Sequence, residues 1–119
     1  MSQDFRPGDY LIFQLEAGYG LLRILAIDGN GGERTWHLAA YEDLFMDVDS
    51  ADEVLKDPAH LTVSHPHLAL TTRAFQSTQV ARMSNQPVTE LEQRLVSEWH
   101  SHPDRETSDR SVRLLMGLR

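Results

Sequence analysis

The 119-residue chain contains no cysteine. That absence excludes disulfides, thiolate nucleophiles and cysteine-ligated metal sites together. No apolar run reaches the roughly 18 residues of a membrane-spanning helix, so none is predicted. Basic residues are scarce as well, because 11 lysines and arginines face 18 acids and the formal net charge is −7. Phosphate backbones and anionic membranes repel such a domain, so we expect no nucleic-acid or membrane partner and an affinity for basic proteins instead.

Signatures of catalysis are also missing. No serine lies in a Gly-x-Ser-x-Gly turn. The glycine-rich segment 28–33 is predicted as a turn, and it lacks the lysine of a phosphate-binding loop. We therefore assign no catalytic residue and no cofactor. The first residues lack the basic and then apolar pattern of a secretion signal, which favours a cytoplasmic protein. The length predicts a single domain over residues 1–119, with residues 1–7 as a lead-in.

Two apolar runs, Tyr10–Leu15 and Tyr19–Ile27, form the centre of the predicted fold. A short Glu16-Ala17-Gly18 connection predicts that they pair as an antiparallel hairpin. Both faces of the hairpin carry apolar side chains, so we expect it to be covered on each side. Alternation places Leu22, Ile24 and Ala26 on one face. Gly20 predicts a bulge or a close approach of the backbone.

The remaining pattern predicts an α+β fold. A third strand at Thr35–Tyr41 has Trp36, Leu38 and Ala40 on one face. Further strands are predicted at 61–64, 67–70 and 79–84, with Pro66 marking an edge or a bend. A capping box beginning at Ser50 predicts a helix over 51–56. Residues 71–78 and 111–118 are predicted as helical turns, and 104–111 as a polar linker.

The strongest helix signal is a second capping box, Thr89-Glu90-Leu91-Glu92, which opens a helix over Thr89–His102. Leu91, Leu95 and Trp99 recur every four residues and predict an apolar stripe. We expect this stripe to cover a strongly bent antiparallel sheet, or small SH3-like barrel, of five to six strands. A symmetric dimer through the same three side chains is the alternative, and a monomer is favoured.

The segment Glu42–Asp57 holds seven acids and one base, Lys56. A solvated loop and helix is its ordinary interpretation. Its charge density and the apolar residues within it also predict a docking face for a basic protein. The predicted partner-binding residues are Asp43, Phe45, Met46, Asp47, Asp49, Asp52 and Glu53.

Histidines gather in two short strings, His65-Pro66-His67 and His100-Ser101-His102-Pro103-Asp104. Zinc binding needs further ligands held by rigid elements, and the second string lacks the surroundings of known zinc motifs. We therefore predict no metal ligands and interpret His100 and His102 as a polar helix end. The alternative is a histidine-based metal-dependent hydrolase that uses His65, His67, His100 and His102 with a carboxylate. A scaffold or regulatory domain is a third possibility.

The order of features along residues 7–90 follows a recognisable pattern. Pro7-Gly8-Asp9 leads into an apolar strand, followed by Ala17-Gly18-Tyr19-Gly20-Leu21-Leu22-Arg23-Ile24-Leu25. An aromatic strand, an acidic segment, a Leu-Thr-Val-Ser strand and Pro87-Val88 come next. This order resembles the immunity protein 26 family, small bacterial proteins associated with polymorphic toxin systems. The resemblance implies a cytoplasmic antitoxin that binds and blocks a cognate toxin. It supplies no catalytic residues.

Overall fold

The computed structural model describes residues 4–30 and 33–117; Gly31 and Gly32 of the predicted turn and Leu118 of the predicted terminal helix lie outside this part. The strands are β1 (Asp9–Leu15), β2 (Gly18–Asn30), β3 (Glu33–Tyr41), β4 (Val63–Thr71) and β5 (Val80–Asn85). The helices are α1 (Val48–Val54), the 3-10 turn η1 (Pro58–His60), α2 (Thr72–Gln76), α3 (Glu90–Ser101) and α4 (Val112–Met116). All strand pairs are antiparallel, in the order β4-β3-β2-β1-β5. The predicted α+β class is confirmed, and in the described residues the sheet is open, with β4 and β5 at its edges.

The central hairpin is confirmed. Leu15 pairs with Gly18 across a two-residue turn, and Phe13 pairs with Gly20. A Cβ on Gly20 would lie 2.7 Å from the Phe13 ring, so the glycine lets this ring lie flat against the neighbouring strand. Gly20 therefore marks a close approach and not a bulge.

The bulge of β2 lies further along, between Ile24 and Ala26. An extra residue in one strand reverses the faces of all residues beyond it. The prediction that Ala26 shares a face with Leu22 and Ile24 is wrong for this reason. Ala26 packs on the opposite, outer face, while Ile27 joins the inner core. The same reversal brings Asp28 to the outer face.

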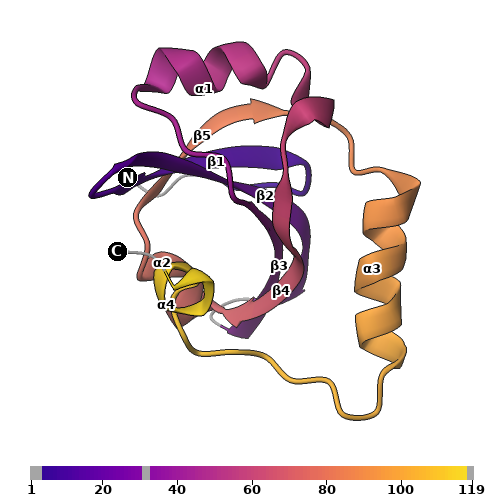
Figure 1. The fold of residues 1–119 in the computed structure, drawn as a ribbon. Helices are drawn as coiled ribbons and strands as arrows, with labels where there is room; N and C mark the ends of the chain where they lie inside the picture. Colours follow the sequence, from indigo (N-terminus) through magenta and orange to yellow (C-terminus); the bar gives the residue numbers. More distant parts are fainter. Residues whose placement is uncertain (1–3, 31–32, 118–119) are drawn as a thin grey trace.

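The sheet curls around a core that α2 and α4 fill from its concave side (Figure 1). Trp36, Leu38 and Ala40 all lie in this core, as predicted. The Trp36 ring stacks on Phe75 of α2 with centroids 4.2 Å apart. Val112 of α4 is fully buried there. The segment predicted only as a terminal turn is therefore a structural part of the core.

Two helices lie on the outer side of the sheet. α1 packs beside Tyr10, Ile12 and Tyr41. Its cap is Asp47, which accepts a hydrogen bond from Ser50 N, so the predicted capping role of Ser50 is wrong and the helix begins earlier. From the N-cap position the Asp47 side chain satisfies the N–H of the third helical residue, one of the free donors at the start of a helix. Among the described residues no helix is long and apolar enough to cross a membrane.

α3 runs along the outer face of β2 and β4 and has the predicted capping box (Figure 1). Its buried residue is Val96, which packs on Leu25 and Ala39. The predicted Leu91–Leu95–Trp99 stripe is confirmed only in part, since Leu95 and Trp99 are half-buried but Leu91 is 63% exposed. The physical reason is the ion pair of Glu92 with the sheet, which turns the Glu92–Val96 side of the helix inward.

The two strands predicted at 61–64 and 67–70 are one continuous strand, β4, so that prediction is wrong, while the edge position predicted for Pro66 is confirmed. Pairing with β3 shifts from Leu38–Leu68 to Ala40–His65, which marks a bulge around Pro66. Ser108 of the predicted linker forms a parallel bridge to Leu70 and exchanges backbone hydrogen bonds with β4. The chain thus passes over the free edge of β4 on its way from α3 to α4.

Candidate functional site

The acidic face predicted from Glu42–Asp57 consists of α1 and the segment that precedes it. Two of its acids have structural roles. Asp43 Oδ1 accepts a hydrogen bond from Thr62 N at 2.6 Å, and Asp47 caps α1. Each of these carboxylates already accepts a hydrogen bond from a backbone N–H group of the same segment or its neighbour. Their main role is therefore to hold the segment in place, and they contribute less to the attraction of a partner.

Apolar side chains protrude from the same face. Met46 is 90% exposed, and Leu44 and Val48 on either side of it are 50% and 43% exposed. Phe45 differs, because it is half-buried against the outer core and its backbone pairs with Tyr19. Phe45 therefore fixes the segment on β2, and its neighbours present the exposed apolar surface.

The remaining predicted residues, Asp49, Asp52 and Glu53, lie exposed on α1. Glu53 forms an ion pair with Lys56 at 3.0 Å between nitrogen and oxygen. Asp49 and Asp52 have no ion-pair partner in the described part of the chain. The face thus combines unpaired negative charge with protruding apolar side chains.

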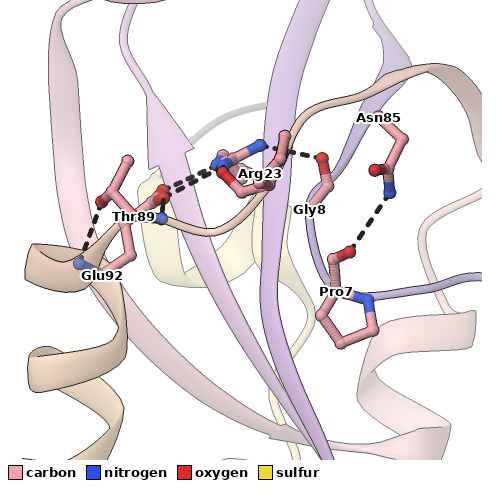
Figure 2. A network of polar contacts seen from close by, with 7 residues as sticks. Pro7, Gly8, Arg23, Asn85, Thr89 and Glu92 are labelled. Atoms are coloured by element: carbon pink, nitrogen blue, oxygen red, sulfur yellow. Dashed lines mark hydrogen bonds and ion pairs between the residues drawn. The ribbon is translucent and has the colours of Figure 1, made fainter.

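A second group of polar residues fixes α3 on the sheet, beginning at its first turn (Figure 2). Arg23 of β2 is 2% exposed, and its Nε and Nη2 donate to the two carboxylate oxygens of Glu92 at 2.7 and 3.0 Å. The carbonyl oxygens of Gly8 and Pro87 accept from the same guanidinium, and the Tyr10 ring lies 4.5 Å below it. All of its charge is therefore compensated inside the protein.

The far end of α3 meets β2 again, at Asp28. His37 Nε2 lies 2.7 Å, and His100 Nε2 2.5 Å, from the same Asp28 Oδ2. His37 is fully buried, whereas Asp28 and His100 are 37% and 46% exposed. Burial alone would raise the pKa of Asp28, but the hydrogen bonds from His100 and His37 hold it below its ordinary value. We call Asp28, His37, His67 and His100 the histidine cluster.

His67 of β4 completes the histidine cluster. Its Nε2 lies 2.8 Å from His37 Nδ1, and the two rings stack. Burial, with smaller contributions from His37 and His100, lowers the pKa of His67 to about 4. Burial also lowers the pKa of His37, although Asp28 opposes it. Both imidazoles are therefore neutral at pH 7.

Trp99 of α3 covers the histidine cluster. Its ring meets the His37 ring edge to face at 4.9 Å, and its Nε1 donates to the carbonyl oxygen of Glu106. Trp99 and His67 both line two open hollows at the surface. The cluster is thus shielded by an indole on one side and reachable from solvent through Asp28 and His100.

The structure brings together only part of the histidine set considered from sequence. His67 and His100 lie in the histidine cluster, but His65 and His102 do not. His65 pairs with Ala40 beyond the Pro66 bulge, which places it on the inner side of the strand, and its Nδ1 contacts the Ser64 hydroxyl. His102 Nδ1 accepts a hydrogen bond from Asp104 N.

Sequence reasoning missed Asp28 and His37. His37 was placed on the face of its strand opposite Trp36, which the structure confirms, but no ligand role was considered for it. Asp28 was interpreted as a turn residue, and only the bulge before it turns it toward His37. The sequence did offer one signal for such a site, because Asp28 and His37 lie near the facing ends of two strands that are paired with each other.

Comparison of the chain with family models, with curated proteins and with solved structures found no match.

Proposed function

We propose that this chain is a non-enzymatic bacterial binding protein that docks a basic protein through the acidic face. Its most concrete form is an immunity protein that acts in the cytoplasm and blocks a cognate toxin. The resemblance of residues 7–90 to the immunity protein 26 family supports this form. The open five-stranded antiparallel sheet agrees with the α+β class predicted from sequence.

The observation that carries the proposal is the exposure of Met46. A methionine that is 90% exposed contributes nothing to the core, and Leu44 and Val48 extend the apolar surface around it. Flexible methionine side chains suit binding surfaces because they adapt to the shape of a partner. Apolar side chains that enter a partner's pocket supply most of the energy of such interfaces.

The charges around Met46 indicate the kind of partner. Asp49, Asp52 and Glu53 project from α1 next to the apolar surface, and the whole chain carries a net charge of −7. A basic protein would be attracted before contact, which raises the association rate more than the final affinity. Because salt screens such attraction, association should slow as ionic strength rises. Occlusion of the toxin by the docked domain would be the inhibitory step.

Co-expression with a toxin encoded by a neighbouring gene tests the proposal. The wild-type chain should restore growth. A variant with Asp49→Asn, Asp52→Asn and Glu53→Gln, combined with Met46→Ala, should restore it poorly while its circular dichroism spectrum stays that of the wild type. A matched control removes exposed charge from α3 instead, with Glu90→Gln and Glu98→Gln, and should rescue fully. Failure of the folded wild-type chain to rescue, or equal loss in the control, removes the proposal.

A further inference from the structure

Three potential ligand atoms from three separate elements converge at the end of α3. They are Asp28 Oδ2 of β2, His37 Nε2 of β3 and His100 Nε2 of α3, and all lie within 4.8 Å of one another. The elements are rigidly held, because β2 and β3 are paired strands and Arg23–Glu92 fixes the other end of α3. Ligands on strands and helices keep their geometry better than ligands on loops.

We propose that Asp28, His37 and His100 bind a divalent transition-metal ion, with Zn²⁺ as the representative. Two imidazole nitrogens and one carboxylate oxygen are donors that Zn²⁺ and its neighbours in the first transition row accept. Ca²⁺ and Mg²⁺ prefer sets made of oxygen alone, so this donor set disfavours them. The inference stands on different residues from the acidic face and does not depend on the proposed binding function.

The cluster needs only a small opening to hold an ion. Around a tetrahedral Zn²⁺ with bonds of about 2.0–2.1 Å, neighbouring ligand atoms are separated by roughly 3.3 Å. The two nitrogens lie 2.7 and 2.5 Å from Asp28 Oδ2, so each of these separations must widen by less than about 1 Å. Asp28 and His100 are partly exposed and can make this movement, while the buried His37 stays fixed.

His67 is placed as a positioning residue for the ion. A histidine that gives Nε2 to a metal carries its proton on Nδ1 and donates it to a second group, which fixes the ring. When the ion takes the place of the Nε2 proton that faces Asp28, His37 carries its proton on Nδ1, and His67 Nε2 lies 2.8 Å away to accept it. Trp99 closes the apolar side of His37 and leaves the solvent side of the cluster for the ion and a bound water.

The proposal is tested by calorimetric titration of the full chain with Zn²⁺. The protein is purified without a histidine tag and dialysed against a chelator beforehand. We expect one equivalent to bind. Asp28→Asn and His100→Ala should each weaken binding at least tenfold, and His67→Ala by about 10–100-fold. His102→Ala is the matched control, because His102 lies at the same helix end but outside the histidine cluster, and it should bind as the wild type does. Replacement of the buried His37 is avoided because it endangers folding.

Three results would overturn the inference. The first is that the wild-type chain fails to bind one equivalent, which leaves a purely hydrogen-bonded cluster. The second is that His100→Ala binds Zn²⁺ as tightly as the wild type. The third is that His102→Ala weakens binding as much as His100→Ala does, which indicates adventitious binding to surface histidines. Visible absorption of the Co²⁺-loaded protein gives a second readout. His67→Ala should alter that spectrum while His102→Ala should not, and an unchanged spectrum in His67→Ala removes the positioning role.

Discussion

Replacement of Glu92 by glutamine isolates the charge that holds α3 on the sheet. Glutamine has nearly the same shape and can keep the N3 position of the capping box. What it removes is the negative charge opposite Arg23, whose side chain is only 2% exposed. The expected result is therefore a cost from an uncompensated buried cation, separate from any loss of helix capping.

The size of this cost follows from the contacts that remain. Removal of one partner of a buried ion pair costs about 3–5 kcal/mol. The carbonyl oxygens of Gly8 and Pro87 and the Tyr10 ring still contact the guanidinium, and Glu92 is 18% exposed in the wild type. We therefore expect the lower end, about 3 kcal/mol. For a domain of this length that corresponds to a fall of roughly 10 °C in melting temperature.

Urea unfolding followed by circular dichroism measures the change in the free energy of unfolding. Glu98→Gln, an exposed position on the same helix, is the control and should change it by less than about 0.5 kcal/mol. A double-mutant cycle with Arg23→Met should show strong coupling to Glu92→Gln. A cost below about 1 kcal/mol, or additive effects in the cycle, would show that the pair does not hold the helix.

Three further perturbations test other parts of the structure. Burial alone would raise the pKa of Asp9, but hydrogen bonds from Asn85, the Arg6 N–H and Arg82 hold it below its ordinary value. The contribution of the Asp9 carboxylate to stability is therefore complete above about pH 4 and is lost as the pH falls through its folded-state pKa. In a plot of melting temperature against pH, Asp9→Asn should therefore show a smaller fall on the acid side than the wild type. Parallel curves for the two proteins would contradict this. Gly20→Ala should cost about 1–3 kcal/mol in urea unfolding because its Cβ meets the Phe13 ring, and a neutral effect would mean that the ring moves aside freely. Trp99→Ala should lower the free energy of unfolding by about 2 kcal/mol, less than the loss of a fully buried tryptophan would, and the protein should sediment as a monomer. If the wild type is instead a dimer that this substitution dissociates without changing the melting temperature, α3 belongs to an interface.

Local signals in the sequence predicted most elements because their causes are local. The capping box at Thr89 needs only residues three apart, and it is present in the structure. Alternation placed Trp36, Leu38 and Ala40 in one core. In these cases the side-chain period and the turn chemistry determine the result within a few residues.

Features that depend on distant partners were not predictable in the same way. Glu92 was predicted only as part of the capping box, and its ion pair with Arg23, 69 residues earlier in the chain, turns this side of the helix inward. The apolar stripe shifted with it and left Leu91 exposed. The position of Asp28 depends on a bulge that no glycine marks. The residues of the histidine cluster come from three strands and a helix, and their spacing along the chain does not predict that they lie close together.

The path of the chain around the edge of β4 also bears on how the protein folds. α4 fills the inner core, and Arg113 beside Val112 donates to the carbonyl oxygen of Gln14, 99 residues away in sequence. Closure of so long a loop comes at an entropic cost before its contacts form, which slows folding. Until α4 inserts, the concave face of the sheet is open and its apolar residues meet water. A chain that pauses at that point exposes an apolar surface that can associate with other copies. Aggregation during refolding should therefore depend on how quickly Val112 packs into the core.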